Sequence, residues 1–454
     1  MGILSEKEEI SLKAIIMAGG EGTRLRPISS GRPKPMTPLL GKPLLEHIIT
    51  LLKEHGIVDI CTTLRFLPEA VTEYFKDGTN LGVNLHHRVE TTPLGTAGGV
   101  RACMDFIGDE DFLVISGDAA CDFDLGELID YHKKTSPAVT MALYSHPEPL
   151  PYGTVLTEPD GLVRRFIEKP SWDRVLTDYV NTGIYIISPE AMKLVPEGKM
   201  FDFAKDLFPL LMSRGMDIRA LSLKGYWCDI GNPAAYLQCS MDALSGALRI
   251  ETGLKKLPGY IYSGSALPRN AELIPPCLIG DGCVIEEGAV IGPQALIGRG
   301  SFIGSKSKIE HSVVDGATIG RGALVSGSVV CRNSYVPPKD TVSPGSIIAV
   351  EGAPLPETPK KADSRSARKS PEKTSVLPCE NRARFMRVLS ESLMEAGADF
   401  SDGLSLKSAD GVVRISPAED SSSIIIEADS SVPGGAARLI TKYRQIAGAL
   451  DVNE

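Results

Sequence analysis

Short apolar runs alternate with amphipathic stretches from residue 13 to about residue 240. The runs at 14–17, 112–115, 139–144 and 183–187 predict buried strands, and 44–55 has the apolar spacing of a helix. Such alternation is typical of an α/β fold, with a parallel-rich sheet covered by helices on both faces. Ligands bind at the carboxyl ends of strands in these sheets, so we expect a site after Met17 and after Ile115.

A second pattern begins near residue 277, where isoleucine recurs at every sixth position. The repeat consists of Ile279, Ile285, Ile291, Ile297, Ile303 and Ile309, with small residues four places after each of the first five. A six-residue repeat predicts a parallel β-helix in which the isoleucines stack inside and the small residues occupy the corners. The pattern resembles the left-handed β-helices of the hexapeptide family. After Ile309 the spacing slips, which indicates an insertion or a capping coil.

Further along, residues 353–378 are rich in proline and charge and contain no aromatic residue, which predicts a flexible linker. Beyond it we expect helices at 381–396 and 436–449 and strands near 404–406, 412–415 and 424–427, the pattern of a small α+β domain. The predicted organisation is therefore an α/β domain at 11–250, a β-helix at 255–352, a linker at 353–378 and an α+β domain at 379–454.

Composition narrows the functional class. The chain of 454 residues carries a formal net charge of −9, which argues against nucleic acid as a partner. The charged first residues predict no secretory signal, and no apolar run is long enough to cross a membrane. The 9 cysteines are scattered without a C-x-x-C pair, so neither a disulfide framework nor a zinc site is indicated. We expect a cytoplasmic protein with reduced thiols.

The most informative segment follows the first apolar run. Gly19, Gly20 and Gly22 form a loop whose backbone N–H groups can cradle phosphates, and Thr23 follows them. Arg24 and Lys34 add positive charge. The segment matches neither the P-loop nor the dinucleotide fingerprint.

This loop resembles the signature of the sugar nucleotidyltransferases, G-G-x-G-T-R-L-x-P followed by P-K-P, and the resemblance implies a Rossmann-like fold for 11–250. It continues in order through segments 93–98, 112–118, 168–170, 180–185 and 225–231. Segments 164–169, 201–209 and the W-x-D-I-G run at 227–231 look most like bacterial mannose-1-phosphate guanylyltransferases.

The resemblance implies an enzyme that transfers a nucleotidyl group from an NTP to a sugar-1-phosphate and releases pyrophosphate. GTP and mannose-1-phosphate are the favoured substrates. Asp118 and Asp229 would bind Mg²⁺, with Arg24, Lys34 and Asp118 as the catalytic residues. Lys169 would hold the sugar phosphate, while Glu168 and Asn181 would bind sugar hydroxyls. The remaining residues implied to contact substrate are Gly19, Gly20, Gly22, Thr23, Gly95, Thr96, Gly98, Gly117 and Gly153.

Several interpretations stay open. The substrates can instead be glucose-1-phosphate with UTP or dTTP, or the chain can be a non-catalytic regulator that binds NDP-sugar. Asp118 can be a helix N-cap, Asp229 a turn residue, and Glu168 with Lys169 a surface ion pair. His311 can belong to an acyltransferase site on the β-helix or to a solvated loop. The β-helix is expected to form a homo-oligomer.

The last domain resembles the C-terminal domain of phosphohexomutases. Arg414, Ser416 and Glu419 fit the R-P-S-G-T-E-P phosphate loop of that domain, but the positions between them do not. The catalytic loops of a mutase have no counterpart in this sequence. The resemblance therefore implies a remnant that helps assembly or binds sugar phosphate as a regulator.

Overall fold

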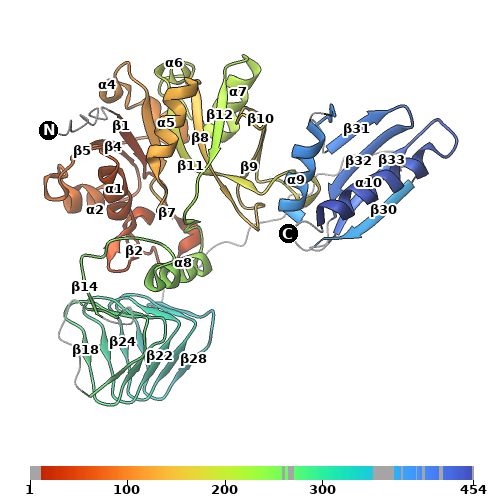
Figure 1. Cartoon of the computed structure of the whole chain (residues 1–454). Helices are drawn as coiled ribbons and strands as arrows, with labels where there is room; N and C mark the ends of the chain where they lie inside the picture. The colour runs from red at the N-terminus through yellow and green to blue at the C-terminus, as the bar shows by residue number, and fades with distance from the viewer. Residues whose placement is uncertain are drawn as a thin grey trace, which may run out of the picture. The chain divides into compact units, whose positions relative to one another are not determined.

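The computed structural model describes residues 12–257, 261–263, 270–350, 373–379, 382–394, 396–400, 404–418 and 423–451 (Figure 1). The chain divides into two compact units, the first made of Met1–Pro93, Ile115–Leu125 and Gly225–Pro359. The second is made of Leu94–Val114, Gly126–Lys224 and Lys360–Glu454. Residues of the predicted α/β domain contribute to both units, which are described in turn.

The first unit contains a parallel α/β layer. Strand β1 (Lys13–Met17) pairs in parallel with β4 (Asp59–Leu64), and β4 pairs in parallel with β5 (Asn84–Val89). The middle of β1 is fully buried, as its apolar run predicts. Helix α1 (Leu44–Glu54) buries an apolar stripe, α2 (Pro68–Phe75) follows β4, and β2 (Pro38–Leu39) pairs with β3 (Lys42–Pro43).

The two residues predicted to bind metal lie beside two short strands of this unit: Asp118 directly precedes β7 (Ala119–Cys121), and Asp229 is the last residue of β13 (Trp227–Asp229). Strand β6 (Phe112–Ser116) runs from the second unit into the first and is followed by β7. Strand β13 pairs antiparallel with β7, and helix α8 (Pro233–Ser245) begins after an Asn232 N-cap. The pairing brings segments that lie about one hundred residues apart in sequence to the same place.

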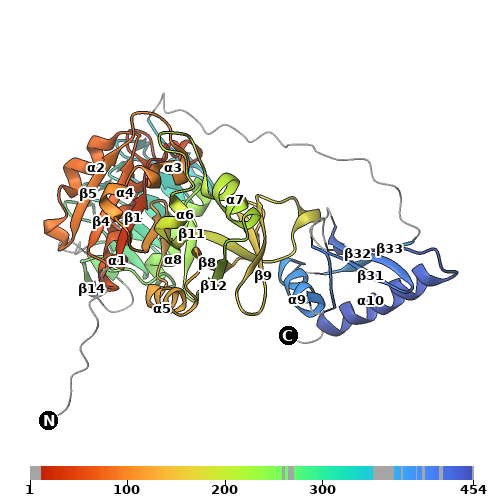
Figure 2. The same cartoon turned by 90° about the horizontal axis from the view of Figure 1, so that it is seen from above.

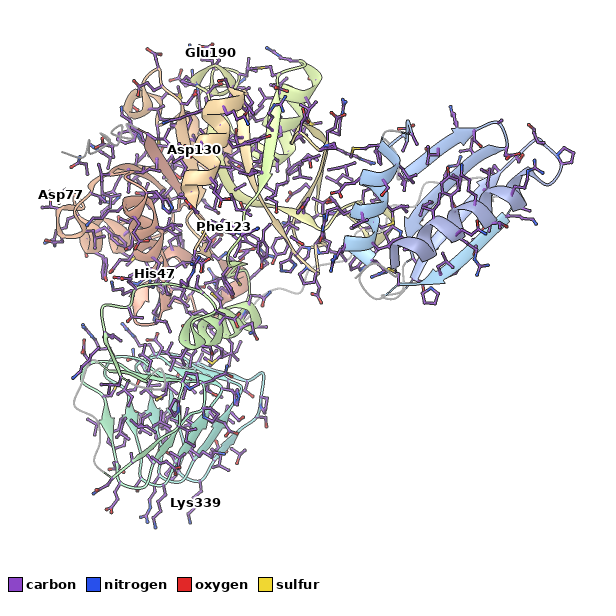
Figure 3. All side chains as sticks on the ribbon, in the orientation of Figure 1. His47, Asp77, Phe123, Asp130, Glu190 and Lys339 are labelled. Carbon is purple, nitrogen blue, oxygen red and sulfur yellow. The ribbon has the colours of Figure 1, made fainter. Side chains whose placement is uncertain are left out.

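The isoleucine repeat forms short strands that stack in parallel sheets, which is compatible with the predicted β-helix (Figure 1). Ile291 pairs with Ile309, eighteen residues later, and these isoleucines belong to one buried core. Where the spacing slips, Ile309 pairs with Val325, only sixteen residues later. The prediction of an insertion or a capping coil was therefore wrong, because the coil is shorter at this point and the stack of paired strands continues beyond it. In Figure 3, Lys339 points outward from this stack.

The strands of this stack are short and follow one another around the coils. Their bounds are β14 (Lys255–Leu257), β15 (Ile261–Ser263), β16 (Glu272–Leu273), β17 (Cys277–Ile279), β18 (Val284–Ile285), β19 (Val290–Ile291), β20 (Ala295–Ile297), β21 (Phe302–Ile303), β22 (Lys308–Glu310), β23 (Ser312–Val314), β24 (Thr318–Ile319), β25 (Leu324–Ser326), β26 (Val329–Val330), β27 (Tyr335–Val336), β28 (Thr341–Val342) and β29 (Ile347–Ile348).

In the second unit most strand pairs of the α/β region are antiparallel. Strand β11 (Tyr179–Ile187) pairs antiparallel with β8 (Val139–Ser145) and β9 (Gly153–Thr157), and β9 pairs antiparallel with β10 (Val163–Glu168). Strand β12 (Ile218–Ser222) is parallel to β8. The α/β prediction is confirmed, but the sheet is mixed, so the expectation of a parallel-rich sheet was wrong for this unit. The helices here are α3 (Gly95–Arg101), α4 (Met104–Ile107), α5 (Leu125–Thr135), α6 (Pro189–Met192) and α7 (Phe208–Ser213).

The second unit also contains the C-terminal module, defined here as residues 373–451. Its sheet has the order β30-β33-β32-β31, and both views show helix α10 (Gly435–Asp451) lying along it (Figures 1 and 2). Helix α9 (Arg382–Met394) precedes β31 (Leu404–Ser408), β32 (Gly411–Pro417) and β33 (Ser423–Asp429), close to the predicted bounds.

Strand β30 (Lys373–Pro378) corrects one predicted boundary. These residues belong to the predicted linker at 353–378, yet each of them pairs antiparallel with β33. Only Val376 and Leu377 are large and apolar, so the sequence gives little sign of a strand. Pairing with the buried strand β33 supplies the stabilisation that local composition lacks. None of the helices among the described residues combines the length and the apolar character required to span a membrane.

Candidate active site

The glycine-rich loop leaves the end of β1 and turns back at Gly22. Gly22 has a φ of +67°, in the left-handed region, and precedes a short 3-10 helix, Thr23–Leu25. A Cβ at this position would lie 2.7 Å from the Cβ of Lys34. The turn therefore requires glycine for its backbone conformation and for its close approach to Lys34. Gly19, Gly20, Thr23 and Arg24 lie in the same loop and its helical turn.

Lys34 joins the two aspartates that were predicted to bind metal. Its Nζ donates to Asp118 Oδ2 at 2.7 Å and to Asp229 Oδ1 at 3.0 Å. The Lys34 side chain is only 7% exposed, whereas those of Asp118 and Asp229 are 39% and 26% exposed. A buried ammonium is held charged by two carboxylates that still reach solvent, and the structure thus brings Lys34, Asp118 and Asp229 together.

The backbone around Asp118 explains how its carboxylate is positioned. Gly117 donates its N–H to Met17 O at 2.9 Å, and a Cβ on Gly117 would lie 2.8 Å from that same oxygen. Ser116 Oγ donates to Asp118 Oδ1 at 2.6 Å. Sequence reasoning passed over Ser116, because a serine at a strand end gives no sign of its partner. Across the β7–β13 pair Asp229 lies opposite Ala119, beside Asp118.

The charged groups of this cluster shift one another's pKa values. Burial alone would lower the pKa of Lys34, but the carboxylates of Asp118 and Asp229 outweigh burial and raise it. Burial acts to raise the pKa of Asp118, yet Lys34 more than compensates and holds it below its usual value. Arg24 also lies near: a Cβ on Gly231 would be 3.1 Å from Asp229 Oδ2 and 3.6 Å from Arg24 Nη2.

The donor chemistry of Asp118 and Asp229 fits Mg²⁺. Hard Mg²⁺ is bound through one or two carboxylates, with phosphate oxygens and waters completing the shell. Two neighbouring, partly exposed aspartates supply that number. The described residues contain no group of three or more His, Cys, Asp and Glu side chains arranged to hold a metal. An ion at this cluster would therefore depend on substrate oxygens for much of its coordination.

The remaining predicted residues lie in the second unit, in two places. At the start of α3, Ala97 and Gly98 donate their N–H groups to Phe201 O at 2.9 Å each. A Cβ on Gly95 would lie 2.7 Å from that oxygen. Thr96 bonds Asp202 Oδ1 through its N–H and its hydroxyl. These glycines thus have an internal packing role, and their contact with substrate stays a prediction.

The second place is the end of the β9–β10 hairpin and the start of β11. Gly153 lies opposite Glu168, and a Cβ on Gly153 would be 2.8 Å from Glu168 Oε2. Lys169 has a φ of +46°, and its Nζ lies 3.9 Å from Glu168 Oε1. Asn181 donates to Tyr185 Oη at 2.8 Å. Glu168 and Lys169 thus form a partly exposed ion pair, and their role in binding sugar stays a prediction.

The positions of several residues in the fold test the alternative interpretations of the sequence. Asp118 lies between β6 and β7 and caps no helix, and Asp229 lies within a strand, not in a turn. Trp227 is buried, which is typical of a residue that packs in the core. His311 lies in an exposed bend between β22 and β23 with a φ of +47°. Of the residues that fit the mutase loop, Glu419 lies outside the described residues, and Arg414 pairs with Asp429.

One cavity in the first unit, of about 640 Å³, lies away from these residues. Its lining includes His47 and Phe123, labelled in Figure 3, together with His55, Asp122 and Arg249. Asp122 accepts hydrogen bonds there from the N–H groups of Tyr226 and Arg249. None of the predicted site residues lines this cavity, so it does not contain the Lys34–Asp118–Asp229 cluster.

Comparison with known proteins gives two family matches. The family described as nucleotidyl transferase matches residues 13–246, and the GMPPB C-terminal domain matches residues 273–353.

Individual relatives resemble the same part of the chain. The chain is 35% identical over 290 residues to a UTP–glucose-1-phosphate uridylyltransferase of Synechocystis sp., and the match covers 59% of this chain and 74% of that protein. It is 33% identical over 270 residues to a mannose-1-phosphate guanyltransferase of Saccharomyces cerevisiae, with coverages of 58% and 72%. A mannose-1-phosphate guanylyltransferase of Mycobacterium tuberculosis is 31% identical over 275 residues, with coverages of 59% and 75%.

Proposed function

The chain belongs to the nucleotidyl transferase family and is a sugar-1-phosphate nucleotidyltransferase, and we propose that it joins GTP to mannose-1-phosphate to give GDP-mannose and pyrophosphate. The observation that carries the proposal is the buried Lys34 bound to Asp118 and Asp229 beside the glycine-rich loop. Two anionic substrates must meet in this reaction, so a site for it needs fixed cations.

In the proposed reaction an oxygen of the sugar phosphate attacks the α-phosphorus of the NTP. The bond between that phosphorus and the β-phosphate oxygen breaks, and pyrophosphate leaves with the electron pair. Arg24 and Lys34 offset the charge of the triphosphate, and the backbone N–H groups of the Gly19–Gly22 loop bind its oxygens. No residue of the chain forms a covalent intermediate, so the protein acts by positioning and by charge neutralisation.

We propose that Asp118 and Asp229 hold Mg²⁺, the cation that best fits their oxygens. When bound, the ion neutralises phosphate charge and helps to align the reacting groups. Ser116 holds one oxygen of Asp118 through its hydroxyl at 2.6 Å, which limits rotation of that carboxylate. Lys34 spans both aspartates and keeps them a fixed distance apart.

A second pair of substrates, UTP and glucose-1-phosphate, is favoured by one observation. The Synechocystis relative with that name is 35% identical to this chain, against 31% and 33% for the two guanylyltransferases described above. The identities are too similar to decide between the bases, and the guanylyltransferase names recur among relatives of several organisms. We therefore place GTP with mannose-1-phosphate first.

We also propose that the stacked strands after residue 270 form a left-handed β-helix through which copies of the chain associate. Outward residues on one of its sheets form a ladder, Val284, Phe302, Thr318 and Tyr335, paired in register. Val284 and Tyr335 are 53% and 56% exposed. Sedimentation of the full chain and of its Tyr335→Glu variant tests this: a single monomeric species for the parent would contradict it.

The test of the proposed function is pyrophosphate release by the full chain with Mg²⁺. Each of GTP, UTP, dTTP, ATP and CTP is offered with mannose-1-phosphate and, separately, with glucose-1-phosphate. We expect the highest kcat/KM with GTP and mannose-1-phosphate. A clear preference for UTP and glucose-1-phosphate would overturn the substrate assignment and leave the reaction class intact. Binding of GDP-mannose without turnover of any pair would overturn the reaction itself.

A further inference from the structure

The C-terminal module contacts residues 171–179, the segment that leads from β10 to β11. The regular structure of this segment is limited to the short helix Trp172–Arg174 and to Tyr179, the first residue of β11. Even so, Val175, Leu176, Thr177 and Asp178 are each no more than 2% exposed. Residues 175–178 belong to no helix or strand, so they need other partners to be buried so completely.

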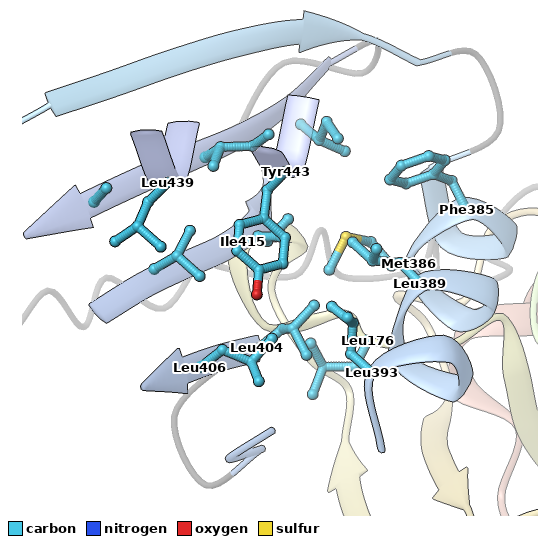
Figure 4. Close-up of a cluster of buried hydrophobic side chains, with 14 of the residues drawn as sticks. Leu176, Phe385, Met386, Leu389, Leu393, Leu404, Leu406, Ile415, Leu439 and Tyr443 are labelled. Atoms are coloured by element: carbon cyan, nitrogen blue, oxygen red, sulfur yellow. The ribbon is translucent and has the colours of Figure 1, made fainter. Parts of the chain in front are cut away.

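Those partners include the hydrophobic core of the module. Leu176 belongs to a buried cluster whose members, apart from Leu156 and Leu176 themselves, come from the C-terminal module. Figure 4 shows Leu176 among Met386, Leu389 and Leu393 of α9. Ser390 Oγ donates to Leu176 O at 3.3 Å, which satisfies a carbonyl that this burial would otherwise leave without a partner.

Two arginines of α9 bind the same segment. The Arg387 guanidinium pairs with the carboxylate of Asp178 and lies 4.6 Å from the ring centre of Tyr179. Arg382 lies 4.0 Å from the ring centre of Trp172 and donates to Ala418 O at 2.8 Å. Cation–π contacts of this kind add to the ion pair when the site is desolvated. The segment is therefore held at both ends and in its middle by one helix.

Asp178 connects helix α9 of the module to the end of strand β8. Its carboxylate is 3% exposed, pairs with Arg387, and accepts a hydrogen bond from Ser145 Oγ at 2.7 Å. Its backbone oxygen accepts from His146 N–H at 2.9 Å. Without Arg387 the charge of Asp178 would be buried with only neutral partners, and the segment would be expected to shift to expose it.

The held segment links the residues predicted to bind the sugar phosphate. Lys169 stands two residues before it, in a left-handed backbone conformation that a lysine rarely adopts, and Asn181 stands two residues after it. Such a conformation persists only where the surrounding chain enforces it. The bond from Lys169 N–H to Tyr152 O, at 3.1 Å, fixes one side, and the anchored segment fixes the other.

We propose that the C-terminal module is an intramolecular clamp that positions Lys169 and Asn181 for the sugar-1-phosphate, with Arg387 as the positioning residue. This inference rests on the proposed function, because it assigns the sugar phosphate to those two residues. It gives the mutase-like module a role that requires neither an intact phosphate loop nor a mutase reaction.

The test compares two arginine variants of the full chain. Arg387→Gln removes the clamp, and Arg438→Gln is the matched control, because Arg438 pairs with Asp410 within the module and its side chain is 54% exposed. For Arg387→Gln we expect the KM for mannose-1-phosphate to rise about tenfold or more, since misplaced binding groups weaken ground-state binding, with kcat and the KM for GTP within about twofold. Arg438→Gln should leave all three within about twofold.

Hydrogen exchange of the segment gives a readout that does not depend on activity. Amides in 171–179 should exchange faster in Arg387→Gln and not in Arg438→Gln. Unchanged exchange in Arg387→Gln would overturn the clamp, and faster exchange with an unchanged KM for mannose-1-phosphate would overturn its positioning role. If Arg387→Gln does not fold, the Asp178→Asn/Arg387→Gln pair, which buries no unpaired charge, takes its place and must show the same KM increase.

Failure of the proposed function gives a different pattern. A parent chain that neither turns over nor binds mannose-1-phosphate or glucose-1-phosphate overturns the proposed function and the positioning role together. In that case faster exchange in Arg387→Gln would still support the clamp as a structural contact. Arg387→Lys keeps the positive charge, and a KM for mannose-1-phosphate that lies between the values of the parent and of Arg387→Gln would further support a charge-dependent clamp.

Discussion

Replacing Gly22 with alanine tests whether the turn after β1 sets the position of Lys34. Gly22 has a φ of +67°, and a Cβ there would lie 2.7 Å from the Cβ of Lys34. Gly31 offers a matched control, because its φ is +75° and a Cβ there would meet nothing within 4 Å. The two alanine variants therefore carry the same backbone strain, and only one of them displaces Lys34.

The magnitudes follow from these geometries. A left-handed backbone costs alanine about 1–2 kcal/mol, so each variant should lose about that much free energy of unfolding. Carbon atoms in contact prefer roughly 3.5–4.0 Å, so Lys34 or the turn must move by about 1 Å in Gly22→Ala. A displacement of that size in a reacting site costs on the order of 100-fold. We expect kcat/KM to fall about 100-fold in Gly22→Ala and less than about twofold in Gly31→Ala.

The assay measures pyrophosphate release at several concentrations of each substrate, with urea denaturation of both variants alongside it. Loss of activity in Gly22→Ala, at a stability equal to or slightly below that of Gly31→Ala, would support the reasoning. Equal kcat/KM in the two variants would refute it, because the contact with Lys34 would then have no bearing on turnover.

Three further predictions concern the rest of the first unit. Asp315→Asn removes the largely buried ion pair with Arg32 and should lower the free energy of unfolding by about 1.5–3 kcal/mol, whereas Asp281→Asn, whose ion pair is exposed, should lower it by less than about 0.5 kcal/mol in urea denaturation. Ile303→Ala, at a fully buried position of the strand stack, should cost about 2–5 kcal/mol in the same measurement, and a smaller cost would contradict the packed core. Burial lowers the pKa of His47 in the folded state below the value of about 6.5 expected in the unfolded chain. The free energy of unfolding should therefore be highest above about pH 6.5 and fall as the pH drops toward the folded-state pKa, by about 1.4 kcal/mol for each pH unit that separates the two pKa values. Unfolding free energies of the parent and of His47→Gln between pH 7.5 and 5 check this, and identical slopes would contradict it.

Local pattern was enough to predict most of the elements. The apolar runs that became β1, β6 and β8 are short, bounded by polar residues and buried over most of their length, so their hydrophobicity alone identified them. The six-residue repeat placed its isoleucines inside for the same reason, and Ile291, Ile297, Ile303 and Ile309 do belong to one buried core, while the β-helix itself stays a prediction. Strand β30 was missed since its stability comes from its partner β33 and not from its own residues.

The chemistry of the site was only partly readable from sequence. Motif order pointed to Arg24, Lys34, Asp118 and Asp229, but the bridge from Lys34 to both carboxylates depends on the β7–β13 pairing, which no local pattern encodes. The ion pair between Asp178 and Arg387 joins residues that are 209 positions apart. Contacts over such separations are set by tertiary packing, and sequence reasoning therefore gave the module no functional contact.

The central claim is that the Lys34–Asp118–Asp229 cluster carries out nucleotidyl transfer, and one variant tests it most directly. Pyrophosphate release is measured for Asp118→Asn with GTP, mannose-1-phosphate and saturating Mg²⁺, and Asp315→Asn serves as a control for the same chemical change elsewhere in the unit. We predict a folded Asp118→Asn protein, by circular dichroism, whose turnover falls at least about 100-fold, while the control keeps most of its activity. Turnover near the parental rate in Asp118→Asn would contradict the account.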